Sequence, residues 1–350
     1  MDIIAFDSHK RYTILRAEDE KGKLIREDRV EHFRGNITKA LEPFVVGTKV
    51  ALETIGSYYW IVSEIEDAGM EPILINAYKA KKMMGSVNKT DRLDVKGLCR
   101  LMRAGVAPEV WIPPKEVLDK RDLPRTRMVF SGMRTKLKNR IHSVFQKYGL
   151  HDFESSDIFS KKGRKEIESK ILLLPENTRF TTERLLDELD CVIEKLKAIE
   201  ERMHEVFDDT PETELLDTVP GVGFLLSVVI LSEVGDIRRF KTASQFAAYC
   251  GTVPRVHSSG GKTRYGTVRN DVNHYLKWAF FEAANHISAV KSAYRGTFVL
   301  SKYMKLRYSK GHAKACGAIA RHLAEAVWSM LMKQEAYKDP FSKVCSSSKA

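Results

Sequence analysis

The chain has 350 residues, of which 43% are hydrophobic and 30% are charged. It contains no run of eighteen apolar residues, its first ten residues lack the pattern of a signal peptide, and its five cysteines form no C-x-x-C pair; a membrane span, secretion, a disulfide framework and a structural zinc site are therefore not expected. The scattered cysteines fit a reducing, cytoplasmic setting. The net charge of +12 favours a polyanionic partner, most often nucleic acid, with a merely basic soluble protein as the alternative.

The first hundred residues alternate between apolar runs and helix signals. Strand patterns occur at residues 3–6, 12–16, 24–30, 49–52 and 72–75. Helix patterns occur at residues 36–41, 57–68 and 91–104. Three strands followed by an alternation of strands and helices predict an α/β domain, a mixed sheet flanked by helices.

Residues 115–147 predict one long helix that is dense in Lys and Arg. Val129, Met133, Leu137, Ile141 and Val144 form an apolar stripe along it. Because Lys and Arg release the counterions condensed on a phosphate backbone, the cationic face predicts contact with nucleic acid, and a solvated helix face is the alternative. The candidate contacts are Lys120, Arg121, Arg125, Arg127, Arg134, Lys138 and Arg140.

A second helical segment, capped by Thr181 or Thr182, carries apolar residues with the 4-3 spacing of a coiled-coil seam. The seam residues are Leu185, Leu189, Val192, Leu196, Ile199, Met203 and Val206. The helix that packs against this seam belongs either to a second copy of the chain or to the same chain, and the spacing is compatible with both. We expect a helical, coiled-coil connector over 151–210 and a homo-oligomer, either a dimer or a tetramer.

Residues 211–340 predict a mainly α-helical C-terminal domain with helices at 224–234, 243–249, 273–286 and 313–332. A glycine-rich turn, residues 219–223, precedes the first of them. Such a turn exposes backbone N–H groups at the positive end of a helix dipole, so Gly221 and Gly223 are candidate phosphate contacts, and a plain helix–helix turn is the alternative. The Ser- and Lys-rich residues 341–350 predict a disordered tail.

The stretch HSSGGKTRYG, residues 257–266, combines two serines and two glycines with basic residues. On the residue types alone, a flexible loop is the first interpretation. A loop that presents a serine to a phosphate is the second, with Lys262 and Arg264 as candidate phosphate contacts. A serine hydroxyl is a poor nucleophile unless a base or a metal activates it, so the second interpretation requires further groups elsewhere in the chain.

Four carboxylates lie where a metal site could form. Asp7 and Glu53 end the first and fourth predicted strands, and Asp91 and Asp94 share one face of a predicted helix. Mg²⁺, or Mn²⁺ in its place, prefers oxygen ligands, and two such ions can stabilise the entering and leaving oxygens of a phosphoryl transfer. Any one of these acids alone would be a surface or capping residue, but together they predict a metal site.

These motifs carry a resemblance. IIAFDSHK, ALETIGSYYW and NKTDRLDVKGL resemble the acidic motifs of the insertion-sequence-110 family of DEDD transposases, and the segment from VPGVG to GKTRYG resembles that family's C-terminal domain. The resemblance runs from Met1 to about Met332. It implies a ribonuclease-H-like (RuvC-like) DEDD domain, which with the basic helix spans 1–150, then a coiled-coil segment, and a C-terminal transposase domain with a catalytic serine.

The resemblance also implies roles for individual residues. Asp7, Glu53, Asp91 and Asp94 would form the catalytic metal-binding tetrad, and a serine of HSSGG would attack the DNA phosphate. We expect Ser259 to be that serine, because it directly precedes the glycine pair, where the backbone can turn most sharply. One segment departs from the family pattern, because NDVNHYLKW lacks the usual glycine and has a lysine in place of an arginine.

The resemblance implies the function of a mobile-element recombinase, in a prokaryotic cytoplasm and associated with the nucleoid. It would use a structured bridge RNA to pair with donor and target DNA, and it would cut and rejoin strands through a phosphoserine intermediate with the assistance of Mg²⁺. Two alternatives remain at this point. A metal-only nuclease of the Holliday-junction type would use the tetrad while HSSGG only binds phosphate, and a non-catalytic relative would bind nucleic acid without cleaving it.

Overall fold

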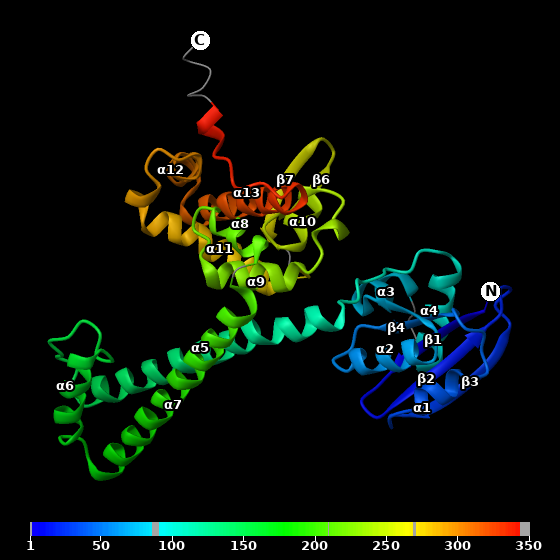
Figure 1. Cartoon of the computed structure of the whole chain (residues 1–350), viewed down its shortest axis with the longest axis horizontal. Coiled ribbons are helices and arrows are strands. Elements are labelled where there is room, and N and C mark those ends of the chain that lie inside the picture. Colours follow the sequence, from blue (N-terminus) through cyan, green and yellow to red (C-terminus); the bar gives the residue numbers. More distant parts are fainter. Residues whose placement is uncertain (1, 86–90, 209, 269–270, 344–350) are drawn as a thin grey trace. The chain divides into compact units, whose positions relative to one another are not determined.

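The structure, a computed structural model, describes residues 2–85, 91–208, 210–268 and 271–343 (Figure 1). The contacts within the chain form two compact units, of which the first ends at Pro113 and the second begins at Pro114. The predicted first domain extended to residue 150, whereas the long basic helix belongs to the second unit because it packs on two other helices there. No helix within the described ranges is long and apolar enough to cross a membrane.

A mixed sheet forms the centre of the first unit, in the order β3-β2-β1-β4-β5. Its strands are β1 (Ile3–Ser8), β2 (Tyr12–Glu18), β3 (Leu24–Glu31), β4 (Lys49–Glu53) and β5 (Glu71–Ile75). The first three strands pair antiparallel, while β4 runs parallel to β1 and to β5. The helices are α1 (Asn36–Leu41), α2 (Tyr58–Asp67), α3 (Ala77–Met84) and α4 (Asp91–Arg103).

Alternation along β1 places two sets of side chains on opposite faces of this sheet. Ile4 and Phe6 pack in the apolar cluster that contains α1 and α2. Ala5 packs on the other face with residues of α3 and α4, and the small side chains of Ala5 and Ala51 leave room for α4 to lie close to the sheet. This mixed α/β unit fits the predicted RuvC-like architecture.

The second unit is mainly helical, as expected. Its helices are α5 (Lys115–Lys147), α6 (Lys161–Ile171), α7 (Glu176–Phe207), α8 (Pro211–Asp217), α9 (Phe224–Val234), α10 (Ala243–Tyr249), α11 (His274–Ala289), α12 (Phe298–Lys310) and α13 (His312–Lys333). Short 3-10 turns are η1 (Ile237–Arg239), η2 (Lys291–Tyr294) and η3 (Pro340–Lys343), and the strands are β6 (Pro254–Ser259) and β7 (Lys262–Val268). Disorder was predicted from residue 341, but Phe341 lies in η3 and packs against Phe298. The rest of the predicted tail, residues 344–350, lies outside the described residues.

Helices α5 and α7 lie side by side and antiparallel, and with α6 they form an arm of the second unit (Figure 1). Leu189, near the start of α7, clusters with Ile141 and Phe145 near the end of α5. At the other end of the arm, Met203 of α7 packs with Leu123 of α5. The apolar seam of α7 is therefore covered by a helix of its own chain, which is the second of the two partners that the sequence left open.

The start of α7 also differs from the prediction. The helix begins at Glu176, directly after Pro175, rather than at a threonine cap. Thr182 is buried inside the helix, and its hydroxyl donates to the carbonyl oxygen of Thr178 at 2.7 Å. A threonine that bonds back to the preceding turn is compatible with a helix interior, so its presence did not mark a boundary here.

We expect Leu196→Asp to destabilise the second unit without changing the mass of the protein. Leu196 is 3% exposed in the seam, so the new carboxylate would be buried without a partner, at a cost of several kcal/mol. Urea unfolding measures the stability and light scattering measures the mass. Lys197→Asp, at the exposed neighbouring position, is the control and should leave both nearly unchanged. A smaller mass with unchanged stability would show that the seam joins two copies after all.

Candidate active site

Asp7 and Glu53 lie at the same edge of the sheet in the first unit. Strands β1 and β4 run parallel with Phe6 opposite Leu52, so the next residues along both strands are Asp7 and Glu53. Because side chains alternate along a strand, these two carboxylates share the face of Ala5 and Ala51, the face that α4 covers. The predicted convergence of the two strand ends therefore follows from the register of the sheet.

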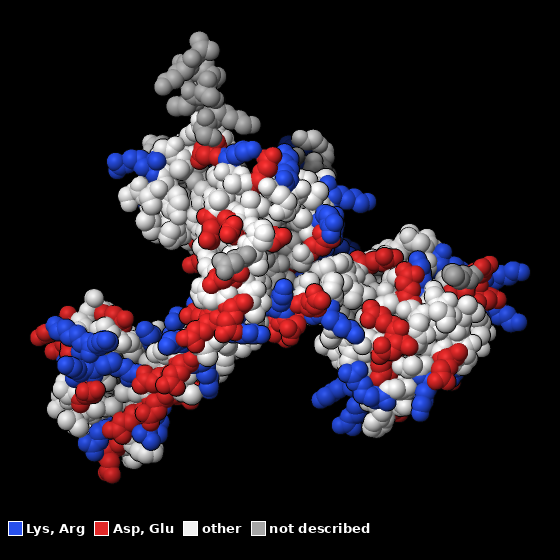
Figure 2. All heavy atoms as spheres, in the orientation of Figure 1, with Lys and Arg blue, Asp and Glu red and all other residues white. Residues whose placement is uncertain are grey.

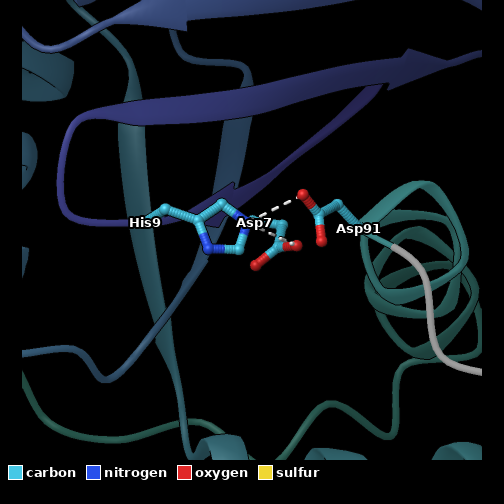
Figure 3. Close-up of side chains that lie close together, drawn as sticks. All are labelled: Asp7, His9 and Asp91. Atoms are coloured by element: carbon cyan, nitrogen blue, oxygen red, sulfur yellow. Dashed lines mark ion pairs between the residues drawn. The ribbon is translucent and has the colours of Figure 1, made fainter.

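Helix α4 brings the third carboxylate to this edge (Figure 3). Its first turn carries Asp91 and Asp94, and the helix packs against β1. The Nε2 atom of His9 lies 3.1 Å from Asp91 Oδ2 and 3.4 Å from Asp7 Oδ2, so the imidazole bridges the two acids. Asp94 is half-buried one turn further along the same helix.

Two residues of this site, His9 and Tyr12, were not predicted from the sequence. The Tyr12 hydroxyl donates to Asp91 Oδ2 at 3.2 Å, and the guanidinium of Arg29 lies 3.8 Å from the centre of the tyrosine ring. Partial burial, and after it the hydrogen bond to Asp91, raises the pKa of Tyr12, so the hydroxyl stays protonated and remains a donor at neutral pH. For His9, the only signal in the sequence was its place two residues after Asp7, on the same side of the extended chain.

The donors at this edge fit a divalent cation. One ligand atom each from Asp7, His9 and Asp91 lies within 4.8 Å of the others. The His9 Nε2 atom is shielded from solvent and has no hydrogen bond of good geometry in the described part of the chain, although two carboxylates lie within ion-pair range. Carboxylate oxygens suit Mg²⁺, and an added imidazole nitrogen also suits Mn²⁺. Glu53 lies on the neighbouring strand and Asp94 on the next helical turn, outside this group of three, and their part in the metal site stays a prediction.

The serine stretch forms a hairpin of two exposed strands, so the interpretation as a flexible loop is wrong. Strands β6 and β7 pair antiparallel, with Ser259 opposite Lys262. Gly260 and Gly261 make the two-residue connection with φ of 57° and 74°. A two-residue hairpin turn of this kind requires positive φ at both positions, which glycine adopts without strain.

The register of the hairpin separates the two serines. Ser259 and Lys262 face each other and share one side of the ribbon with the next alternate pair, His257 and Arg264. The other side carries the pairs Ser258–Thr263 and Val256–Tyr265. The Ser258 hydroxyl lies 3.4 Å from the Thr263 hydroxyl. One side of the hairpin is therefore cationic and carries Ser259, while the side that carries Ser258 is uncharged.

Arg121 does not lie on a cationic face, and its prediction as a nucleic-acid contact is wrong. Its side chain is buried, and it donates to the carbonyl oxygens of Ser232 at 2.7 Å and Glu233 at 2.9 Å. Burial lowers the pKa of its guanidinium, in opposition to the nearby Glu233 carboxylate. The residue links α5 to the end of α9, where it satisfies carbonyl groups that the helix leaves without partners.

Two more of the predicted arginine contacts are engaged inside the second unit. Arg125 donates through Nε and Nη2 to the two carboxylate oxygens of Glu233, at 2.7 and 2.9 Å. Arg127 donates twice to Glu200 of α7. Along the visible face of the arm, basic and acidic side chains are interspersed (Figure 2). The remaining candidates on α5 form no such carboxylate pair within the part of the chain that the structure describes; they are Lys120, Arg134, Lys138 and Arg140.

Glu233 is buried at the junction of three elements. Besides Arg121 and Arg125 of α5, it accepts a 2.7 Å hydrogen bond from the Nδ2 atom of Asn273. The side-chain oxygen of Asn273 caps α11 by accepting from the Leu276 N–H. One carboxylate therefore ties the arm, helix α9 and the start of α11 together.

We expect Glu233→Ala to lower the free energy of unfolding by about 3–5 kcal/mol, because it leaves buried Arg121 without its counter-charge. Urea unfolding followed by circular dichroism measures the loss. Glu205→Ala is the control, because its exposed pair with Arg202 is worth at most about 1 kcal/mol. Equal losses for the two variants would contradict a buried network.

The two glycines predicted as phosphate contacts in the turn before α9 differ in their surroundings. Gly221 has φ of 80°, and a Cβ atom there would lie 2.5 Å from the carbonyl oxygen of Ala283, so this glycine permits close packing on α11. Burial raises the pKa of Tyr294, and a hydrogen bond from the Gly221 backbone opposes this effect, so the backbone of Gly221 already has a partner. Gly221 is therefore a packing residue. Gly223 is exposed at the N-terminus of α9, and its phosphate contact stays a prediction.

The segment that departs from the family pattern still starts α11 correctly. Asn273 caps the helix in the absence of the usual glycine. Val272 lies so close to Gly251 that a Cβ atom on this glycine would come within 2.7 Å of it. The Cδ atom of Lys277 would lie 3.3 Å from the same Cβ atom, so the aliphatic part of this lysine packs near Gly251.

Comparison with known proteins matches the two segments that carry the candidate site residues. A transposase model named for its DEDD residues and for IS110 matches residues 4–149, which contain the carboxylates, and the model described as "Transposase IS116/IS110/IS902 family" matches residues 213–299, which contain the serine hairpin. The chain belongs to the IS116/IS110/IS902 family of transposases. The resemblance recognised in the sequence is confirmed.

Similar family members span most of the chain. The transposase for insertion sequence element IS1111A of Coxiella burnetii is 27% identical over 344 residues, which are 96% of this chain and 91% of that protein. A probable family 20 transposase of Pseudomonas aeruginosa is 24% identical and covers 83% of this chain and 85% of its own length. The transposase for IS1328 of Yersinia enterocolitica is 22% identical, with coverage of 80% and 82%. The likeness thus extends beyond the two matched segments to the arm between them.

Proposed function

We propose that this transposase is a bridge-RNA-guided DNA recombinase that cuts and rejoins strands through a phosphoserine formed on Ser259. The observation that carries the proposal is the hairpin register, which places Ser259 on the cationic side of an exposed ribbon. The tetrad of Asp7, Glu53, Asp91 and Asp94, at one sheet edge of the first unit, supplies the metal ligands in this proposal. Family membership supports the DNA substrate, because such proteins move DNA segments.

The residues of the hairpin suit the phosphoryl transfer. The Ser259 hydroxyl loses its proton as its oxygen forms a bond to phosphorus, one phosphorus–oxygen bond of the DNA backbone breaks, and the departing DNA oxygen takes up a proton, so no proton is gained or lost overall. Lys262 and Arg264, on the same side as Ser259, donate to the non-bridging phosphate oxygens and stabilise the charge that develops there. The return attack by a DNA hydroxyl restores the phosphodiester and releases the serine.

In this proposal, the carboxylates of the first unit and the residues beside them bind the metal ions. Asp7, Glu53, Asp91 and Asp94 would hold Mg²⁺ or Mn²⁺, with His9 beside them. When bound, such ions stabilise the attacking and leaving oxygens of the transfer. Tyr12 fixes the orientation of the Asp91 carboxylate by donating to one of its oxygens, which leaves the other oxygen for a ligand.

The guide RNA supplies the choice of sequence in this proposal. Exposed basic side chains hold phosphate backbones without reading bases, so a protein that binds through them gains specificity from base pairing. On α5, Lys120 and Arg140 are exposed, with Arg134 and Lys138 half-exposed. Two duplexes must be cut and exchanged, which favours an assembly of several copies, with an interface other than the covered seam of α7.

A trapping experiment tests the proposal against its two rivals. The protein is incubated with Mg²⁺, the non-coding transcript of its element, and donor and target DNA, and the products are separated on a denaturing gel. We expect a covalent protein–DNA adduct that requires the RNA. Cleavage without an adduct would favour the metal-only nuclease, and binding without cleavage would favour the non-catalytic relative. A control with a scrambled RNA shows whether pairing directs the reaction.

A further inference from the structure

The first unit has an open depression of about 410 Å³ that the metal site does not use. It is lined by Lys10, His32, Arg34 and Trp60. Lys10 lies in the turn after β1, His32 and Arg34 follow β3, and Trp60 lies in the first turn of α2. A cavity of this volume falls in the range of small-ligand sites, which is about 300–1,000 Å³.

The walls of the depression are held in place by a chain of hydrogen bonds. His32 Nε2 lies 2.7 Å from the Thr13 hydroxyl, which lies 2.9 Å from the Ser8 hydroxyl. The His32 ring meets Trp60 edge to face, with ring centres 4.9 Å apart. Burial lowers the pKa of His32, so this ring is neutral at neutral pH and provides shape and hydrogen bonding.

The charge of the depression comes from Lys10 and Arg34, which are both exposed. The guanidinium of Arg34 lies 5.7 Å from the centre of the Trp60 ring. Two acids lie nearby, Glu31 and Glu64, but their carboxylates are engaged with other groups. Glu31 pairs with Arg29, and Glu64 accepts hydrogen bonds from backbone N–H groups at the start of α1. The depression therefore combines an indole ring with two cations.

The depression lies at the same end of β1 as the metal site and opens on the other face of the sheet. Asp7 faces α4, whereas the next residue, Ser8, is buried on the opposite side beside Thr13. Lys10 follows Asp7 by three residues, so the two Cα atoms are at most about 11 Å apart. A strand that touches Lys10 can thus continue to the carboxylates within one or two nucleotides.

We propose that this depression binds one unpaired nucleotide, with its base stacked on Trp60 and its phosphates against Lys10 and Arg34. The inference rests on the proposed function and adds a substrate subsite next to the tetrad. Sites for single-stranded nucleic acid combine aromatic stacking with cationic contacts to the backbone, and they accept any base because every base has a π face. The site therefore selects a nucleotide that is unpaired and does not distinguish between the four bases. This nucleotide belongs to either a DNA strand or the RNA.

The test measures binding of short single-stranded oligonucleotides to the full chain by fluorescence anisotropy. Oligothymidine, its RNA counterpart and an abasic oligomer with the same backbone are the three probes. We expect Trp60→Ala to weaken binding of the base-containing probes about tenfold and to leave the abasic probe unchanged. Trp60→Phe should keep most of the affinity, because it retains an aromatic face. Stronger binding of DNA than of RNA, or the reverse, identifies which strand the site holds.

A double variant at two exposed residues, Lys10 and Arg34, tests the inference even if Trp60→Ala unfolds the first unit. Lys10→Ala with Arg34→Ala should weaken all three probes and reduce the slope of log affinity against log salt by about two, because two phosphate contacts are lost. Lys21→Ala, in the turn at the opposite end of the sheet, is the matched control and should change neither.

Unchanged affinity in both the folded Trp60 variant and the double variant would overturn the inference, while the Ser259 adduct would be unaffected. The opposite failure is distinguishable, because binding to these probes needs no cleavage. If Ser259→Ala still forms an adduct but Trp60→Ala loses binding, the proposed function fails and the nucleotide site stands.

Discussion

Ser259→Ala is expected to abolish the covalent protein–DNA adduct and strand transfer, with folding and RNA binding intact. The side chain is exposed near the tip of a hairpin, so its removal leaves no cavity and no buried partner. Loss of a nucleophile removes the reaction rather than slowing it, because no other group on the cationic side of the ribbon is a hydroxyl. The measurement is mass spectrometry of the peptide that stays attached to cleaved DNA.

Ser258→Ala is the matched control for this variant. Its hydroxyl contacts Thr263 on the uncharged side of the ribbon at 3.4 Å, a long contact whose loss is worth at most about 1 kcal/mol. We expect this variant to keep most of the activity. A phosphodiester mapped to Ser258, or an adduct that survives in Ser259→Ala, would sink the assignment of the nucleophile.

Asp7→Asn should reduce strand transfer by at least about 100-fold, because mutation of the outer partners of metal ligands alone costs 10–100-fold. Asp7 contributes from the central strand of the sheet, and its Oδ2 atom lies 3.4 Å from His9 Nε2 in the group that also contains Asp91. An asparagine keeps the volume and removes the charge, so the first unit should fold normally. Calorimetric titration with Mn²⁺ gives a second readout, and we expect its binding to weaken in parallel.

Asp67→Asn, at the end of α2, is the control for charge and should leave both measurements unchanged. Asp94→Asn tests the far member of the tetrad, and we also expect it to remove strand transfer while RNA binding stays near normal. Full recombination in Asp7→Asn or in Asp94→Asn would refute the tetrad as the metal site.

Most of the elements could be predicted because local signals mark their boundaries. The limits of α5, α9 and α10 agree with the sequence patterns, and Pro114, Gly223 and Thr242 stand directly before them. The convergence of Asp7 and Glu53 was also predictable, since adjacent parallel strands end at one edge. These inferences depend on neighbours in the chain or on a simple rule of sheet geometry.

The serine hairpin escaped prediction for a physical reason. Nearly every residue of β6 and β7 is exposed on both sides, so the strands show no alternation of apolar and polar residues. The remaining signal, Gly260-Gly261, is equally typical of a flexible loop and of a two-residue turn. The separation of Ser258 from Ser259 follows only once the pairing register is known.

The pairing of the α5 arginines and the partner of the α7 seam could not be predicted for a different reason, which is distance along the chain. Glu233, the carboxylate that pairs with Arg125, lies 108 residues further along the sequence. Composition alone therefore could not distinguish a paired arginine from a free one. The stripe on α5 was also read as continuous, whereas Val129 and Met133 are exposed and the residues nearer the end of the helix are buried. The covering of the α7 seam by α5 depends on the turn through α6. Ser160 caps α6, but a helix cap does not indicate which two helices the turn brings together.

The burial of Glu233 also has a consequence for the order of folding. Contacts between the end of α5 and the start of α7 close a loop of a few tens of residues, which costs little chain entropy and forms quickly. The contacts of Glu233 with Arg121 and Arg125 close loops of more than a hundred residues, so they form late. A nascent chain can thus complete the outer half of the arm while α9 is still being synthesised, and the buried carboxylate joins the arm to the C-terminal helices in the final step.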